Sequence, residues 1–220
     1  MHCRRLRQRR AAGLVVAWVF LMAASLSGGA APAFSREPKV ELKETIDKVL
    51  GVLKNSAYKG DDKREVRRQK LREVIGPRFD FAEMAKRSLA RYWRQRTPEE
   101  QKEFVEVFSD LLERSYVSKI EGYTDEKIEY PHERVEDRYA EVKTKIVPQS
   151  GRDIPIDYRL HKTPTGWRVY DVVIEGVSLV SNYRGQFNRI IRKDSYKDLL
   201  QRMKNKQEDI RSNKDSKGDL

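Results

Sequence analysis

The apolar residues of this chain change their spacing at Gly122, and this change limits the possible folds more than any other feature of the sequence. Before Gly122 they recur at helical spacing, between residues 128 and 174 they alternate with charged residues as in strands, and beyond Ser178 the helical spacing returns. This order predicts an α+β domain in which a helical part packs on a curved four-stranded antiparallel sheet.

Helices are expected over about residues 40–53, 61–75, 80–93, 98–121, 178–191 and 195–203. The start at residue 98 is the best defined, because Thr97, Pro98 and Glu100 combine an N-cap, a proline at the first helical position and a capping-box glutamate. The helix over 61–75 is mostly charged, so we expect it at the surface.

Four strands are expected between residues 128 and 174, joined by tight turns that include 148–151 and 163–166. Their alternation predicts one face against the core and one face in water. In the last strand, the odd-numbered residues from Trp167 to Val173 are expected on one face and the even-numbered residues from Tyr170 to Ile174 on the other.

The first 33 residues have the pattern of a cleavable export signal. Five arginines and no acid precede an apolar stretch over residues 11–26, and small residues then lead to Ala33. We expect cleavage before Phe34. An uncleaved anchor is the alternative, which is disfavoured because the stretch is shorter than the ~20 apolar residues that span a bilayer.

Removal of residues 1–33 would take away five arginines and no acids, which lowers the formal charge from +12 to +7. It would also remove Cys3, the single cysteine, so disulfides, thiolate zinc sites and cysteine nucleophiles are not expected. Residues 34–203 are expected to form one domain. Residues 204–220 are polar and without aromatic residues, which predicts a disordered charged tail.

The sequence carries no recognisable catalytic or metal-binding motif. His132 and His161 stand at no metal-ligand spacing, so both are expected at the surface. We therefore expect no catalytic residue, no metal and no cofactor, and the chain is not expected to be an enzyme.

The segment from Arg184 to Lys206 has eight lysines and arginines against Asp194 and Asp198. Such a patch can bind nucleic acid or anionic lipid headgroups, or it can be a solvated helix face. An exported protein meets little nucleic acid, so no nucleic-acid partner is expected. The other two interpretations remain open.

The run YDVVIEGVSLVSNYRGQF, residues 170–187, closely resembles the signature of the MlaC-like family, the toluene-tolerance-type phospholipid-binding proteins of the periplasm. A second match is the segment 92–94 followed by 97–101 and 104–112 with Tyr116, which is similar to the central helix pair of that family. The resemblance extends over residues 40–203 in the right order.

The resemblance implies a monomeric periplasmic carrier with a cone-shaped fold, akin to nuclear transport factor two, that encloses an apolar cavity for acyl chains. Its partners would be a phospholipid, an outer-membrane lipoprotein complex, and an inner-membrane ABC transporter with its lipid-receiving domain protein, in a system that maintains outer-membrane lipid asymmetry. Some relatives are associated with hopanoids, so the lipid class stays open. Two alternatives remain: a cavity enzyme of the same shape, such as an isomerase or cyclase, and an envelope adaptor that binds no lipid.

The apolar stripes of the helices and the inner face of the sheet are the candidate cavity walls, although such a stripe is often plain core. The candidate lipid-binding residues are Phe81, Leu89, Tyr92, Phe104, Phe108, Leu111, Tyr116, Val142, Ile146, Ile156, Tyr158, Val172, Ile174, Val177, Tyr183 and Phe187. Docking to partners is expected at Arg189, Arg192 and Lys193. Arg184 is expected to meet a phosphate or an internal carboxylate such as Glu175, and the ion pair is favoured.

Overall fold

The computed structural model describes residues 37–123 and 125–215, and the predicted export signal lies outside these ranges. The helices are α1 (Pro38–Lys54), η1 (Ser56–Tyr58), α2 (Arg64–Ile75), α3 (Phe81–Leu89), η2 (Ala90–Gln95), α4 (Pro98–Glu121), α5 (Leu179–Lys193) and α6 (Tyr196–Asp215). The strands are β1 (Lys127–Glu136), β2 (Tyr139–Val147), β3 (Ile154–Thr163), β4 (Gly166–Ile174) and β5 (Val177–Ser178). This element order confirms the predicted α+β class.

The sheet is antiparallel, with its strands in the order β1-β2-β3-β4-β5. The sequence pattern predicts four strands and misses the fifth, β5. Val177 of β5 pairs with Ile174 of β4 across a two-residue turn. Both turn residues, Glu175 and Gly176, have positive φ angles of 49° and 82°, as tight hairpin turns require. A two-residue strand is too short to produce a visible alternation, which is why the sequence pattern does not reveal it.

A bulge at Tyr170 changes which residues of β4 face the core. Leu160 opposes Val169, but Arg159 opposes Asp171, so β4 has one extra residue at this point. The alternation predicted for β4 is wrong beyond the bulge. The even-numbered residues after Tyr170 join Val169 on the core face, whereas Asp171 joins Tyr170 on the other face.

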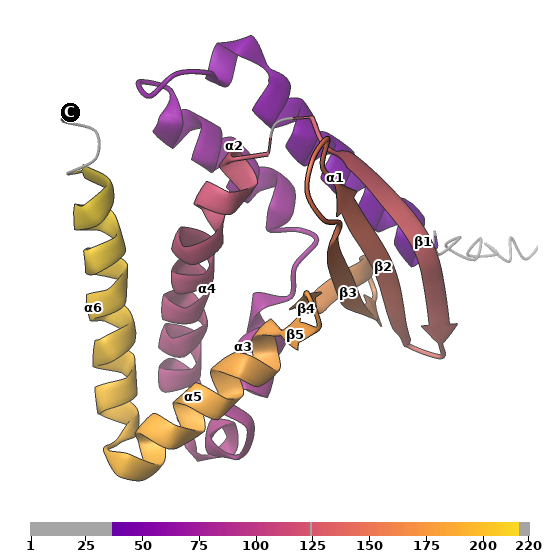
Figure 1. The fold of residues 1–220 in the computed structure, drawn as a ribbon. Helices are drawn as coiled ribbons and strands as arrows, with labels where there is room; N and C mark the ends of the chain where they lie inside the picture. The colour runs from indigo at the N-terminus through magenta and orange to yellow at the C-terminus, as the bar shows by residue number, and fades with distance from the viewer. Residues whose placement is uncertain (1–36, 124, 216–220) are drawn as a thin grey trace, which may run out of the picture. The chain divides into compact units, whose positions relative to one another are not determined.

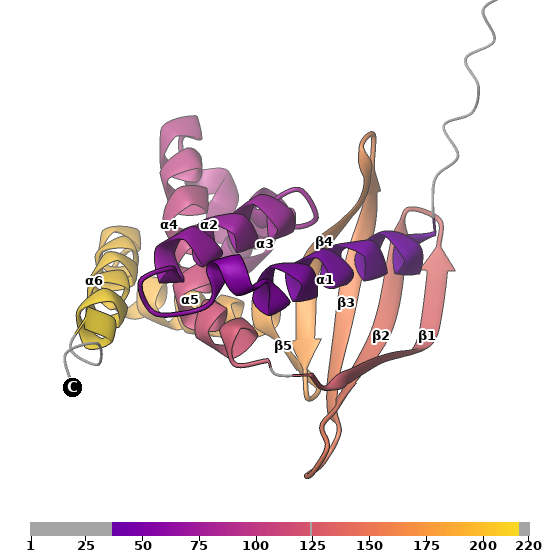
Figure 2. The ribbon, with the colours of Figure 1, turned by 90° about the horizontal axis from the view of Figure 1, so that it is seen from above.

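The described residues form two apolar clusters rather than one. In the sheet cluster, α1 lies across one face of the sheet, and its Leu42 packs against Val142 and Leu160 (Figure 2). In the helical cluster, α3, α4, α5 and α6 pack on one another beside the sheet (Figure 1). Phe79, between α2 and α3, packs against both clusters.

Helix α4 begins as predicted and forms the centre of the helical cluster. The Thr97 hydroxyl accepts from the Glu100 backbone N–H at 3.2 Å, and the Glu100 carboxylate accepts from the Thr97 N–H at 3.0 Å. This capping box confirms the prediction. Phe104 and Phe108 of α4 are completely buried.

The prediction of a disordered tail from Lys204 onward is wrong for residues 204–215, because α6 continues to Asp215. Helix α6 lies along α4, where Lys204 pairs with Glu103 at 2.7 Å and the Gln207 side chain donates to the Val107 carbonyl at 2.7 Å. Ile210 packs against the helical cluster. The apolar residues of α6 recur at helical spacing and, together with these two polar contacts, hold the segment against α4 although its composition is polar.

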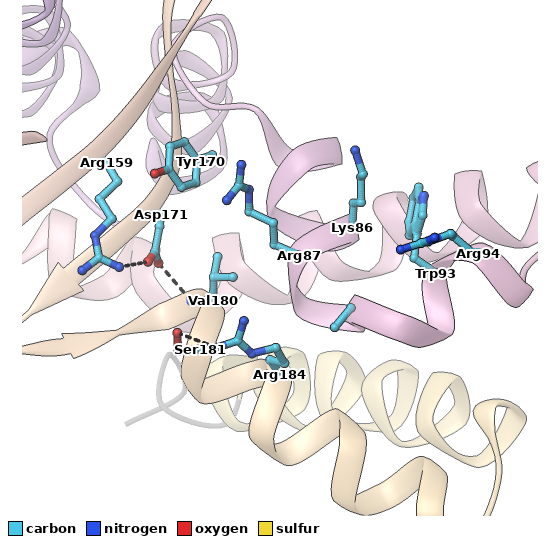
Figure 3. A pocket seen from close by; sticks show the side chains of 11 residues that line it. Lys86, Arg87, Trp93, Arg94, Arg159, Tyr170, Asp171, Val180, Ser181 and Arg184 are labelled. Carbon is cyan, nitrogen blue, oxygen red and sulfur yellow. Dashed lines mark hydrogen bonds and ion pairs between the residues drawn. The ribbon is translucent and has the colours of Figure 1, made fainter. Parts of the chain in front are cut away.

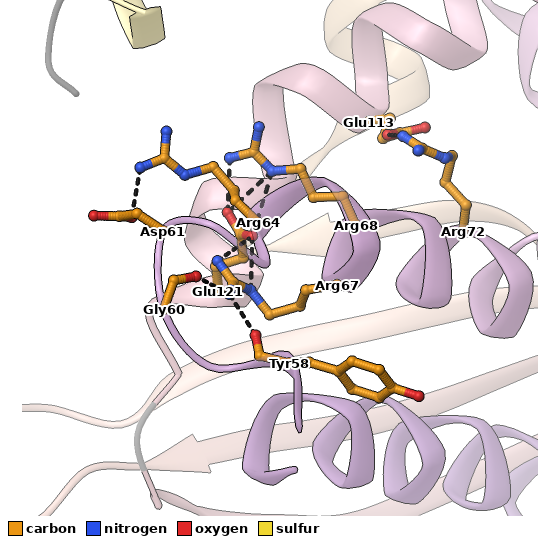
Figure 4. Close-up of polar contacts among 9 residues, drawn as sticks. All are labelled: Tyr58, Gly60, Asp61, Arg64, Arg67, Arg68, Arg72, Glu113 and Glu121. Carbon is orange, nitrogen blue, oxygen red and sulfur yellow. Dashed lines mark hydrogen bonds and ion pairs between the residues drawn. The ribbon is translucent and has the colours of Figure 1, made fainter. Parts of the chain in front are cut away.

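Helix α2 lies largely at the surface as expected, with Leu71 as its buried residue. Its arginines connect it to the end of α4, where Arg67 and Arg68 both pair with Glu121 (Figure 4). One turn further along α2, Arg72 pairs with Glu113 of the same helix α4.

Candidate functional site

The apolar face of the sheet is closed at one end and partly open at the other. Val142, Leu160 and Val169 are fully buried at the end that Leu42 of α1 covers. Further along the same face, partly buried side chains take over: Ile146, Ile156, Tyr158 and Ile174. The register places these residues together, because Ile156 opposes both Thr144 and Ile174, and Tyr158 opposes Val142.

Two partly buried tyrosines among these apolar residues have hydroxyls in surroundings that disfavour ionisation. Burial raises the pKa of Tyr158 to about 12, and burial also raises the pKa of Tyr130. The hydroxyl of Tyr130 is buried and has no hydrogen-bond partner within the part of the chain that the structure describes. An unsatisfied hydroxyl at an apolar face is costly, and it can donate to a polar group that enters there.

The helical cluster has a closed aromatic centre and a partly open rim. Phe104, Phe108 and Phe187 contact one another with ring centroids 5.6–5.9 Å apart. At the rim, Tyr183 packs edge-on against Phe108 at 5.2 Å. Tyr183 and Tyr116 are only partly buried, and burial raises the pKa of both hydroxyls.

The candidate lipid-binding residues thus do not form one continuous wall. Those in the helical cluster are Phe81, Leu89, Phe104, Phe108, Leu111, Tyr116, Tyr183 and Phe187. Those in the sheet cluster are Val142, Ile156, Tyr158, Val172 and Ile174. The fully buried candidates are packed as core, so direct contact with a ligand would require them to move.

Three candidates belong to neither cluster, although Ile146 shares the sheet face of Ile156. Val177 is 55% exposed in β5. Tyr92 of η2 donates from its hydroxyl to the Asn188 side chain at 3.2 Å. Ile146 is partly buried near the end of β2, opposite Ile128 and Ile154.

One pocket of the described residues is open and basic, and thus differs from the enclosed apolar cavity that the resemblance implies. This pocket lies between α3, η2, α5 and the face of the sheet opposite α1, with a volume of about 630 Å³ (Figure 3). Its lining residues are Lys86, Arg87, Ala90, Trp93, Arg94, Arg159, Tyr170, Asp171, Val180, Ser181 and Arg184. We refer to it as the basic pocket.

Asp171 is the acid of the basic pocket and is 3% exposed. Its carboxylate accepts from the Ser178 hydroxyl at 2.6 Å, from the Val180 N–H at 3.0 Å and from Arg159 at 3.1 Å. The bulge at Tyr170 turns Asp171 toward α5, so this carboxylate joins β4 to the start of that helix. Sequence alternation places Asp171 on the opposite face from Tyr170 and therefore misses both the network and the pocket.

The structure does not form the favoured ion pair between Arg184 and Glu175. Glu175 pairs with Arg152 instead. Arg184 lines the basic pocket, where it donates to the Ser181 hydroxyl at 3.3 Å. The predicted docking residues Arg189, Arg192 and Lys193 are exposed along the second half of α5.

The prediction that both histidines lie at the surface is wrong for His161. Asp80 caps α3 and thereby lies against β3, where its carboxylate is 3.0 Å from the Nε2 atom of His161. The His161 side chain is 21% exposed, whereas His132 lies open to solvent. Within residues 37–123 and 125–215, no cluster of His, Cys, Asp and Glu is arranged to hold a metal ion. No helix of that part combines the length and apolar character needed to cross a bilayer.

Comparison with known proteins places this arrangement in a family. The family model for the MlaC protein matches residues 43–205. The toluene tolerance protein ttg2D of Pseudomonas putida is 24% identical over 155 residues, which cover 70% of this chain and 72% of the relative. The intermembrane phospholipid transport system binding protein MlaC of Haemophilus influenzae is 22% identical over 171 residues, which cover 76% of this chain and 80% of the relative.

A solved structure is similar over nearly its whole length. It is the phospholipid-binding protein from Ralstonia solanacearum in complex with a phospholipid, with a TM-score of 0.72 and 28% sequence identity. The match covers 79% of this chain and 98% of the neighbour. Fold, matched residues and relatives agree, and the chain belongs to the MlaC family.

Proposed function

We propose that this chain is a periplasmic phospholipid carrier that holds acyl chains between its two apolar clusters. The observation that carries the proposal is the likeness to a neighbour solved with a bound phospholipid, together with the partly open apolar faces of the sheet and of the helical rim. The proposed activity is binding and transfer, without a chemical reaction.

The physical need for such a carrier is large. A diacyl lipid in water exposes two chains of ~15 methylenes, and at ~0.8 kcal/mol per methylene its transfer from a bilayer costs on the order of 20 kcal/mol. The carrier must replace most of that apolar contact. Ile156, Tyr158 and Ile174 from the sheet, with Tyr116 and Tyr183 from the helices, are the side chains best placed to begin this contact, because they are apolar or aromatic and only partly buried.

The phospholipid would enter by separation of the two clusters. Each cluster is packed internally, and in the part of the chain that the structure describes Phe79 packs against both. Movement of the clusters as units would expose Val172 of the sheet and Tyr183 of the helical rim further to the acyl chains without breaking the packing inside either cluster. The Tyr130 hydroxyl, which has no partner within the described residues, would then be available to an ester oxygen.

In the cell, the carrier would exchange its lipid with an inner-membrane ABC transporter, through the lipid-receiving domain protein of that transporter, and with an outer-membrane lipoprotein complex. The name of the Haemophilus influenzae relative, an intermembrane phospholipid transport system binding protein, supports this role. Residues 1–33 would direct export, and the exposed residues Arg189, Arg192 and Lys193 would contact an acidic partner surface.

Native mass spectrometry tests the proposal. The chain without residues 1–33 is purified gently from a bacterial periplasm, and the mass of the intact protein is compared with its mass after organic extraction. The expected result is an excess mass of one phospholipid, which returns when the extracted protein is incubated with phosphatidylglycerol vesicles. Protein that carries no lipid and cannot be reloaded would overturn the proposal.

A further inference from the structure

The basic pocket has more positive charge than the fold itself neutralises. Its lining contains five basic side chains and one acid, Asp171. Lys86 and Arg87 share a single carboxylate, that of Glu83, at 3.3 and 2.8 Å. Arg94 and Arg184 also line the pocket and form no ion pair within residues 37–123 and 125–215.

The acid of the pocket does not offset this surplus toward a ligand. Asp171 already accepts from Ser178 and from the backbone of Val180, and it pairs with Arg159. The negative charge of Asp171 is thus compensated by groups of the protein itself. An anion that enters the pocket would meet the guanidinium groups without an opposing free carboxylate.

Part of the basic lining is held in place before any ligand arrives. Arg87 lies over the Tyr170 ring, 4.1 Å from its centroid, and Glu83 accepts from its Nε atom at 2.8 Å. Arg159 is tied to Asp171. Preorganised arginines lose little side-chain entropy when they bind, and their planar donor groups match the oxygens of a phosphate.

The start of α5 also lines the basic pocket. Val180 and Ser181, in the first turn of α5, form part of the lining. The N-terminal end of a helix carries partial positive charge, and here Asp171 and the Ser178 hydroxyl accept from the Val180 and Ser181 N–H groups, so the basic side chains provide the attraction for a further anion. Figure 3 shows basic side chains from α3, η2, α5 and the sheet around one space.

We propose that the basic pocket binds a phosphate group. It is separate from the apolar faces proposed to hold acyl chains, because the bulge in β4 turns Tyr170 and Asp171 to the opposite side of the sheet from Val172. The phosphate can belong to a headgroup at an anionic membrane surface or can be free in solution. Both sources offer the same oxygens to the same guanidinium groups.

The test uses two double variants that remove the same charge from exposed positions. The pocket variant is Arg94→Gln with Arg184→Gln. The control variant is Lys48→Gln with Arg138→Gln, at exposed positions on α1 and in the β1–β2 turn. Binding of inorganic phosphate is measured by isothermal titration calorimetry, and binding to phosphatidylcholine vesicles with and without phosphatidylglycerol is measured by flotation.

Wild type and the control variant are expected to bind phosphate saturably, with at least tenfold weaker binding by the pocket variant. If the membrane is the source, the pocket variant also loses binding to phosphatidylglycerol vesicles, and free phosphate displaces wild type from them. If free phosphate is the ligand, vesicle binding is equal in the two double variants. The proposal is overturned if the pocket variant and the control variant lose phosphate binding equally. It is also overturned if wild type binds neither phosphate nor vesicles saturably. Bound lipid is determined in the same samples, so failure of the carrier function is recorded separately.

Discussion

Glu121, the last residue of α4, accepts a hydrogen bond at 2.8 Å from the guanidinium of Arg68 in α2, and the two side chains are only 13% and 15% exposed. Arg67 pairs with the same carboxylate at 3.0 Å. Two arginines from one helix thus meet on one acid of another, with little water to screen them (Figure 4).

Substitution of Glu121→Gln should lower the free energy of unfolding by about 1.5–3 kcal/mol, because it leaves two poorly hydrated guanidinium groups without a counter-charge. Urea unfolding measures the change. The control is Glu73→Gln, which breaks the exposed pair with Lys70 and should change stability by less than about 0.5 kcal/mol. Equal effects of the two substitutions would mean that the α2–α4 contact depends on something other than this ion pair.

Substitution of Asp171→Asn should destabilise the fold by about 2 kcal/mol or more. The asparagine side chain has one oxygen acceptor and one NH₂ donor in place of two carboxylate oxygens. The Ser178 hydroxyl or the Val180 N–H therefore faces a donor and loses its hydrogen bond. The control is Asp153→Asn, which affects an exposed pair with Lys145. Chemical unfolding should separate the two variants clearly. An Asp171→Asn protein as stable as the control would contradict the role given to the buried network.

Alkaline pH should unfold the protein through its buried tyrosines. Burial raises the pKa of Tyr158 and of Tyr196 to about 12, and a raised tyrosine pKa means that the folded state favours the protonated hydroxyl. The stabilisation that each protonated hydroxyl provides is therefore complete below pH ~10, the pKa of tyrosine in the unfolded chain. It is lost as the pH rises from ~10 to ~12.

Absorbance of tyrosinate at 295 nm and circular dichroism, recorded together through this pH range, check the prediction. Ionisation of the buried tyrosines should coincide with loss of structure. A Tyr158→Phe variant lacks one of the two ionising hydroxyls. Its free energy of unfolding should therefore fall less than that of wild type when the pH is raised from 7 to 12. Ionisation of all tyrosines near pH 10 in a protein that stays folded would show that these hydroxyls are not buried.

Transfer of lipid to a membrane or partner should depend on the basic end of α5. A triple substitution of Arg189, Arg192 and Lys193 by Glu should slow transfer and reduce its salt dependence, but leave the amount of bound lipid unchanged, because exposed charges act on encounter and hardly on a buried apolar ligand. A fluorescent-lipid transfer assay at low and at physiological salt measures this. A control that changes Lys48, Arg138 and Lys143 to Glu carries the same net charge. If both triple variants behave alike, net charge rather than a docking surface governs the rate.

The element order of the fold could be predicted from the sequence, because each long helix and strand has a periodic pattern or a cap of its own. Thr97 and Glu100 mark the start of α4, and the alternation around Val142 and Tyr158 marks β2 and β3. The bulge at Tyr170 could not be predicted in this way. Nothing in a run of alternating residues reveals that one of them lacks a cross-strand partner, and the whole face assignment beyond it changes as a result.

The candidate site was accessible to sequence analysis only in part. Apolar stripes identify Phe104 and Ile156 equally well, yet the first is completely buried and the second partly open, because burial depends on which elements pack on them. The basic pocket was missed for the same reason. Lys86, Arg159 and Arg184 lie far apart in the sequence and only the tertiary fold brings them to one space.

The most direct test of the account is the amount of phospholipid bound by an Ile156→Asp variant, compared with a Val135→Asp variant. Ile156 is partly buried on the apolar sheet face, whereas Val135 is a 50% exposed residue of β1, so both changes place the same charge in the same sheet. An Ile156→Trp variant, which fills space without adding charge, guards against loss of lipid through unfolding. Lipid per protein is measured by native mass spectrometry on samples that unfold cooperatively in urea. The account predicts at least tenfold less lipid in Ile156→Asp, less lipid in Ile156→Trp, and a wild-type amount in Val135→Asp. A folded Ile156→Asp protein with a wild-type amount of lipid would contradict it.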